Sequence, residues 1–95
     1  MPRTGLKRAT IVIRGRGVAV GLRYVPGEGG VPIVVCRAKG DQADVMIEAA
    51  AELGIPRAPD HGLASALVKK VTPGSPLPNR FFDRAARAIY AAGQA

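Results

Sequence analysis

Short runs of apolar, largely β-branched residues dominate the first third of the chain. Residues 9–14 and 18–24 combine apolar and polar positions over strand length, and residues 32–36 are apolar without a break. The first two runs predict strands, and the third predicts a strand buried on both faces. Because only a Gly-Arg-Gly stretch separates the first two strands, they are expected to pair antiparallel. The glycine-rich segment 26–30 predicts a surface turn.

Helical spacing replaces strand spacing after residue 40. Asp41, with Asp44 three residues later as a weak capping box, predicts the start of a helix that ends at Gly54. The apolar positions that repeat at helical intervals, and are therefore expected to face the core, are Val45, Met46, Ala49, Ala50 and Leu53.

The last third of the chain predicts one short strand and two more helices. Residues 55–58 form only a short strand, and Pro56 favours an edge position or a strand start. Asp60 is expected to cap a brief helix, and Pro78 or Asn79 to open a final one. The residues expected to face inward from these two helices are Leu63, Ala66, Leu67, Phe82, Ala85, Ala86 and Ile89.

The predicted order of elements is therefore β-β-β-α-β-α-α. The fold class is α/β, a small mixed four-stranded sheet covered by helices, with a parallel, right-handed crossover between the third and fourth strands. The 95 residues suffice for one domain. Residues 1–8 are expected to be a basic leader, 9–92 the domain and 93–95 a tail.

The charge is strongly positive and uneven. The net charge is +7, and six basic residues precede the first acid, Glu28; they are Arg3, Lys7, Arg8, Arg14, Arg16 and Arg23. Such a surface favours nucleic acid, anionic lipid or an acidic protein face as a partner, or serves solubility alone. One cysteine excludes an internal disulfide and favours the cytoplasm, and no stretch has the length of a membrane span or the pattern of a signal peptide.

Few residues suggest an enzymatic or metal site. His61 is the only histidine and lies beside a helix start, while Cys36 follows two valines and is expected to be a buried small hydrophobe. The scattered acids give no metal-ligand cluster, and no cofactor is expected. The stretch Arg14–Gly17 leads into a strand, so it fits neither a dinucleotide fingerprint nor a P-loop. Its glycines indicate positive φ or a lack of room for a Cβ.

Three segments together resemble a known family. They are TIVIRGRGVAVGLRYVPGEGGVPIVVCRAKG (10–40), IEAAAELGIP (47–56) and HGLASALVKKVTPGSPLP (61–78), followed by an amphipathic helix. This pattern resembles the cytoplasmic domain of the FlhB/YscU/HrcU (SctU) family, the export-apparatus switch proteins of bacterial type III secretion systems and flagella. The resemblance implies the same mixed α/β fold.

The resemblance also implies a reaction that this chain lacks. The family carries Asn-Pro-Thr-His at the turn between its first two strands, where the asparagine amide attacks its own backbone carbonyl and breaks the Asn–Pro bond. The matching residues here are Arg14, Gly15, Arg16 and Gly17. An arginine side chain is cationic and has the wrong length for a five-membered imide, and the only asparagine is Asn79. The chain is therefore expected not to cleave itself and not to be an enzyme.

The expected function is that of a non-cleaving switch module that acts by protein–protein binding. The expected partners are export-apparatus components or export substrates, with no small-molecule substrate, and the expected contact residues are Arg16, Arg23, Arg37 and Lys39. The expected location is the cytoplasm, with the membrane reached only through the export apparatus at the inner face of the inner membrane. The alternative is a basic nucleic-acid-binding domain, although the predicted strands lack aromatic platforms. A stand-alone relative and an excised part of a longer protein both fit the sequence.

Overall fold

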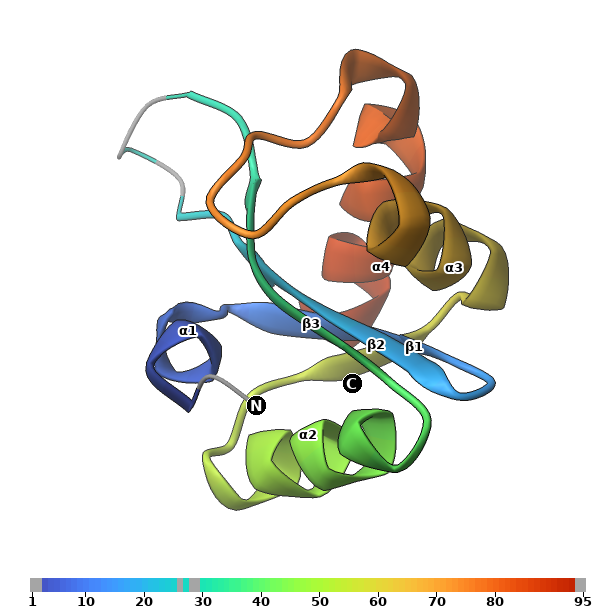
Figure 1. The fold of residues 1–95 in the computed structure, drawn as a ribbon. Coiled ribbons are helices and arrows are strands. Elements are labelled where there is room, and N and C mark those ends of the chain that lie inside the picture. Colours follow the sequence, from blue (N-terminus) through green and yellow to red (C-terminus); the bar gives the residue numbers. More distant parts are fainter. Residues whose placement is uncertain (1–2, 26, 28–29, 94–95) are drawn as a thin grey trace.

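Four strands form one mixed sheet with helices on both of its faces in the computed structural model (Figure 1). The structure describes residues 3–25, 27 and 30–93. The sheet order is β3-β2-β1-β4, antiparallel except for the parallel pair β1–β4. The strands are β1 (Ile11–Gly15), β2 (Val18–Arg23), β3 (Ile33–Lys39) and β4 (Arg57–Pro59). The predicted α/β fold with a mixed four-stranded sheet is confirmed.

The helices divide between the two faces of this sheet. They are α1 (Arg3–Arg8), α2 (Asp41–Glu52), α3 (His61–Lys70), the 3-10 turn η1 (Asn79–Phe81) and α4 (Phe82–Gly93). Helices α1 and α2 cover one face, and α3 and α4 cover the other (Figure 1). Helix α2 connects β3 to β4, which run in the same direction as the crossover predicts but have β2 and β1 between them.

Helix α1 lies where the sequence predicts only a basic leader. Leu6 is buried among residues of α2 and the sheet, which anchors this short helix. Gly5 sits so close to the carbonyl oxygen of Val35 that a Cβ would collide with it. A six-residue helix with a single buried leucine gives no periodic signal, and this is why the pattern along the chain misses it. Residues 1–2, 94–95 and most of the predicted turn at 26–30 lie outside the described residues.

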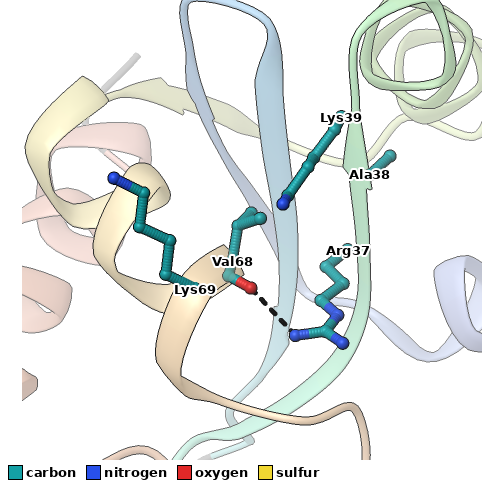
Figure 2. A pocket seen from close by; sticks show the side chains of 5 residues that line it. All are labelled: Arg37, Ala38, Lys39, Val68 and Lys69. Atoms are coloured by element: carbon teal, nitrogen blue, oxygen red, sulfur yellow. Dashed lines mark hydrogen bonds between the residues drawn. The ribbon is translucent and has the colours of Figure 1, made fainter.

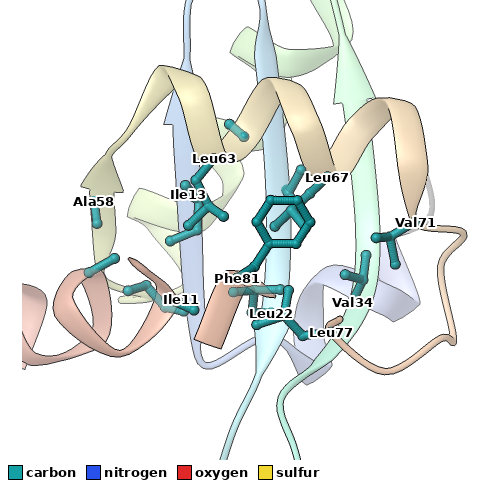
Figure 3. Close-up of a cluster of buried hydrophobic side chains, with 14 of the residues drawn as sticks. Ile11, Ile13, Leu22, Val34, Ala58, Leu63, Leu67, Val71, Leu77 and Phe81 are labelled. Carbon is teal, nitrogen blue, oxygen red and sulfur yellow. The ribbon is translucent and has the colours of Figure 1, made fainter. Parts of the chain in front are cut away.

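The side chains of the two central strands alternate between two hydrophobic cores. Ile11, Ile13, Val20 and Leu22 face α3 and α4, where they pack with the leucines of α3 and with Phe81 (Figure 3). Val12 and Ala19 face the other way, toward α1 and α2. Each of these side chains is fully or almost fully buried. Because successive side chains of a strand point to opposite faces, the same pair of strands contributes side chains to both cores.

The strand β3 forms one edge of the sheet, and a loop covers its first half. The amide of Val34 donates to the carbonyl of Ser75 (3.0 Å), and the amide of Gly74 donates to the carbonyl of Val34 (2.7 Å). The amide of Leu77 donates to the carbonyl of Pro32 (2.8 Å). This loop and the helices on both faces bury Val34, Val35 and Cys36, as the unbroken apolar run predicts. At the other edge, β4 comprises Arg57–Pro59 rather than the predicted residues 55–58, and Pro56 lies just before this edge strand.

Two details of α2 differ from the sequence prediction. The N-cap is Gly40, with φ of 60° and no side-chain cap, so Asp41 is already the first helical residue. The chain leaves β3 through this glycine, which has no side chain to cap the helix, and the amide of Ala43 donates to the Gly40 carbonyl (3.0 Å). Val45 and Leu53 are 44% and 50% exposed, because α2 packs through Ala43, Met46 and Ala50 instead. Small residues on this face let the helix approach the sheet closely.

The inward face of α4 is also displaced from its predicted position. Phe81, Ala85 and Ala88 are buried against the sheet, whereas Phe82 is half-buried and Ala86 is exposed. The apolar arc of this helix is wider than the face that the sheet covers. The sequence prediction assigned the whole arc to the core, and the surplus forms a separate surface described below.

A β-bulge in the β2–β3 pair fixes the position of the single cysteine. Gly21 pairs with Cys36 and the next residue, Leu22, pairs with Val34, so Val35 is the extra residue. A Cβ at Gly21 would lie 2.5 Å from the sulfur of Cys36. Burial raises the pKa of the Cys36 thiol, while a hydrogen bond with the Gly21 backbone acts in the opposite direction. The prediction that Cys36 is a buried small hydrophobe is confirmed by its burial.

Gly21→Ala is expected to destabilise the fold, because its new methyl group overpacks the Cys36 thiol. The free energy of unfolding should fall by about 1–3 kcal/mol, measured by urea denaturation. In the double variant Gly21→Ala/Cys36→Ala the loss should be smaller than the sum of the two single losses, since the sulfur is gone. Additive losses would contradict the proposed clash.

Candidate functional site

The turn between β1 and β2 is short and tightly built. Gly15 pairs with Val18, which leaves Arg16 and Gly17 as the connection. Gly17 has φ of 65° and open space around it, so its role is conformational. Gly15 is constrained by space instead, because a Cβ there would lie 2.6 Å from Nδ1 of His61. The two reasons that the sequence predicts for the glycines therefore apply to one glycine each.

Three hydrogen bonds hold the turn against the rest of the fold. The amide of Asp60 donates to the carbonyl of Arg14 (2.9 Å), and the amide of Gly40 donates to the carbonyl of Gly17 (2.8 Å). The amide of Arg16 donates to Nδ1 of His61 (3.0 Å). Since this nitrogen accepts a hydrogen bond, the proton of the neutral imidazole is on Nε2. His61 thus holds the turn in place through this hydrogen bond. The two residues are 45 positions apart, and the sequence does not reveal their contact.

Asp60 fixes the helix end that carries His61. Its carboxylate accepts a hydrogen bond from the amide of Leu63 (3.1 Å), which is the predicted N-cap of α3. The same carboxylate forms an ion pair with Arg84 of α4. A Cβ at Gly62 would lie 2.8 Å from the Arg84 guanidinium, so the absence of a side chain there admits this arginine. Strand β4, α3 and α4 consequently meet at one carboxylate.

The turn itself presents cations and backbone rather than reactive groups. Arg14 and Arg16 are exposed, and the nearby imidazole is occupied by a backbone amide. Cys36 is buried between β2 and the helices α1 and α2. Among the described residues, no group of three or more His, Cys, Asp or Glu side chains has the arrangement of a metal site.

The four predicted contact residues do not share one surface. Arg23 lies at the end of β2 away from the turn, where Nη1 donates to the carbonyl of Arg8 (3.0 Å). Arg37 and Lys39 lie on the second half of β3, and Lys39 pairs with Val18 beside the turn. Arg16 and Lys39 are thus close to one end of the sheet, and Arg23 is at the other.

Arg37 is a structural residue as well as an exposed one. Its Nη1 donates to the carbonyls of Val68 (2.8 Å) and Val71 (3.1 Å), at the C-terminal end of α3. A cation at this end interacts favourably with the helix dipole and with carbonyls that lack a helical partner. This contact ties the edge strand β3 to α3 on one face of the sheet.

A groove of about 460 Å³ opens between β3 and the last turn of α3 (Figure 2). Its lining residues, called the basic groove below, are Arg37, Ala38, Lys39, Val68 and Lys69. The sequence prediction included Arg37 and Lys39 but treated Lys69 only as a helix-end residue. No sequence signal joins residues 30 positions apart; the fold brings them together.

A second groove, of about 470 Å³, lies between α4 and the segment that leads into β3. Its lining residues, called the apolar groove below, are Tyr24, Gly30, Val31, Pro32, Phe82, Ala86, Ile89 and Tyr90. Tyr90 is 70% exposed, an unusual position for a large aromatic ring. The sequence prediction missed this groove, although the wide apolar arc of the last helix was the signal for it.

No helix within the described part of the chain has the length and apolar character needed to cross a membrane.

A protein-family model matches nearly the whole chain. The model described as the FlhB HrpN YscU SpaS Family matches residues 2–91. The probable translocation protein y4yO of Sinorhizobium fredii is 47% identical over 94 residues, which are 99% of this chain and 27% of that protein. The hypersensitivity response secretion protein HrcU of Ralstonia nicotianae is 32% identical over 84 residues, 88% of this chain and 23% of that protein. The chain therefore spans about a quarter of the length of these relatives.

A solved structure is similar over almost all of both chains. It is the C-terminal domain of EscU in a variant with an asparagine changed to aspartate, with a TM-score of 0.85 and 29% identity. The match covers 94% of this chain and 96% of the EscU chain. The sheet and helices described above are thus similar to those of this EscU domain.

Two substitutions at Asp60 should separate its cap from its ion pair. Asp60→Ala removes both and is expected to lower the free energy of unfolding by about 1–2 kcal/mol. Asp60→Asn retains the oxygen that accepts from Leu63 but loses the charge facing Arg84, and should cost less than about 1 kcal/mol. Urea denaturation measures both, with Asp83→Asn, on an exposed residue, as the charge-matched control. Equal losses for the two Asp60 variants would contradict a role for the cap.

Proposed function

Because this chain belongs to the FlhB HrpN YscU SpaS family, we propose that it is a non-cleaving switch module of a type III protein secretion system. It acts by binding other proteins, in a flagellar or an injectisome system. Its relatives are named for translocation and secretion, and the fold is similar to that of the EscU domain over almost the whole length of both chains. The chain matches only about a quarter of the length of these relatives, so a role in secretion like that of the full-length relatives is proposed for it.

The observation that carries the proposal is the short turn between β1 and β2, in which Arg14-Gly15-Arg16-Gly17 stands in place of the family's Asn-Pro-Thr-His. In the reaction that the family resemblance implies, a side-chain amide nitrogen attacks the carbonyl carbon of its own residue and closes a five-membered imide. Arg14 occupies the position of that asparagine and supplies a protonated guanidinium, which is neither nucleophilic nor of the right length. The relevant residues Arg14–Gly17 therefore form a charged turn that keeps β1 and β2 covalently joined.

The proposed partners are components of the export apparatus or its substrates, and the proposed location is the cytoplasm beside the inner membrane. The contact residues proposed from the sequence are Arg16, Arg23, Arg37 and Lys39; two of them line the basic groove. No resident cofactor or small-molecule substrate forms part of the proposal. The comparisons do not support the alternative of a nucleic-acid-binding domain.

The apolar groove is the proposed site for an apolar segment of an export substrate. The groove is concave, and its lining comes from α4 and from the segment before β3. Exposed apolar side chains that gather in one concavity favour a short apolar peptide segment as the occupant. Tyr90 supplies a large ring at its wall, a residue type common in protein contacts.

Mass spectrometry under denaturing conditions tests the absence of cleavage. The purified chain should give one species with the mass of all 95 residues, because no residue at the turn can form the imide. Two fragments, produced by a break between residues 14 and 15, would contradict the proposal. The four-fold variant R14N/G15P/R16T/G17H provides the positive control and should cleave at that bond.

This positive control is made with and without His61→Ala. A side chain at residue 15 would meet the imidazole at 2.6 Å, and removal of the ring gives it more room.

Two alanine-to-glutamate changes on α4 test the apolar groove. Ala86→Glu places a charge in the groove, and Ala91→Glu places the same charge on an exposed position outside it. Only Ala86→Glu should reduce co-purification of export substrates with the tagged chain from secreting cells, by at least about tenfold for a buried unpaired charge. Both variants should have similar thermal stability, because both positions are exposed. Equal co-purification with both would contradict the groove assignment.

A further inference from the structure

We propose that the basic groove binds an acidic, aspartate- or glutamate-containing segment of a partner protein. This inference rests on the proposed function, since it names the chemistry of one partner of the secretion module. The groove is distinct from the apolar groove and shares no lining residue with it. It lies between β3 and the C-terminal end of α3 (Figure 2).

The cations of this groove are not neutralised within the described part of the molecule. Lys39 and Lys69 are exposed and make no hydrogen bond or ion pair with any described residue. The ion pair between described residues joins Arg84 to Asp60, away from the groove. Three positive charges along one concavity repel each other, and carboxylates placed among them would relieve that repulsion.

Arg37 is held in a fixed position with three of its five N–H donors unused. Both of its hydrogen bonds to α3 come from Nη1. Nε and Nη2 make no hydrogen bond to a described residue, and together they form one edge of the planar guanidinium. This edge matches the two oxygens of a carboxylate. Because the side chain is already immobilised, a bound carboxylate loses less affinity to the ordering of this arginine.

Most acids on the described residues lie on the opposite face of the sheet from the groove, and the other two, Asp60 and Asp83, do not line it. Asp41, Asp44 and Glu48 lie on α2, which packs against the face remote from α3. They are exposed there and do not line the basic groove, so its cations remain available to an external anion. Because no acid lines the groove, its cations attract and orient an approaching acidic segment.

The shape of the groove favours a polypeptide over a lipid surface or a nucleic acid. A concavity of about 460 Å³ admits individual side chains, whereas a bilayer requires protruding cations. The exposed large apolar residues that would insert into lipid lie elsewhere, among them Val45, Leu53 and Tyr90. The groove also has no aromatic ring on which a base would stack.

Fluorescence anisotropy with a labelled peptide of alternating glutamate and alanine tests this inference. The unmodified chain should bind it at low salt, and binding should weaken as salt rises. The variant Lys39→Gln/Lys69→Gln should bind about tenfold more weakly, from the loss of two exposed charge pairs. The charge-matched control, Lys7→Gln/Arg87→Gln, alters two exposed cations outside the groove and should bind like the unmodified chain.

Several outcomes would overturn the inference. These are no binding at low salt, equal weakening in both double variants, and equal binding of a peptide with glutamine in place of glutamate. Binding to phosphatidylserine vesicles or to a single-stranded oligonucleotide that exceeds binding to the acidic peptide would also overturn it. None of these results affects the secretion role, which the co-purification with export substrates measures separately through the apolar groove.

Discussion

The pairing of β1 with β2 at the centre of the sheet is the constraint on which the rest of the structure depends. Both strands are internal, so each exchanges hydrogen bonds with neighbours on both sides. Their side chains supply both hydrophobic cores, and every long helix packs against one of those cores. The turn that joins these strands is therefore part of the scaffold, although it is exposed. Its backbone contacts with Gly40 and Asp60 connect it to the starts of α2 and α3.

A sheet covered on both faces leaves little space, and glycines mark the closest approaches. Gly5 admits α1 to β3, Gly15 admits the start of α3 to the turn, and Gly21 admits the cysteine sulfur. At each of these positions a side-chain Cβ would have no room. Close packing of this kind fixes the positions of surface groups too, because the elements that carry them cannot shift independently. The cations of β3 and the carboxylate of Asp60 gain their defined positions in this way.

The order of the strands and of the longer helices was predictable from the sequence, whereas the short helix α1, the buried faces of α2 and α4 and the contacts between elements were not. The strand period, the N-cap at Asp60 and the resemblance of three segments to one family were sufficient for the fold. The structure places Phe81 rather than Phe82 in the core, because a 3-10 turn opens α4 and the sheet covers only part of its apolar arc. The hydrogen bond between His61 and the turn and the position of Lys69 beside Arg37 depend on long-range packing. A set of candidate contact residues chosen by charge alone therefore included Arg23, which the fold places at the other end of β2.

The two edges of the sheet bear on how this protein behaves at high concentration. Exposed strand edges are where separate molecules join their sheets and aggregate. The loop at 74–77 occupies the first half of β3, and the charges of Arg37 and Lys39 flank its second half. At the opposite edge, β4 has three residues, and Pro59 has no amide hydrogen to donate. Such edges disfavour the pairing of strands between neighbouring copies when many copies are crowded together.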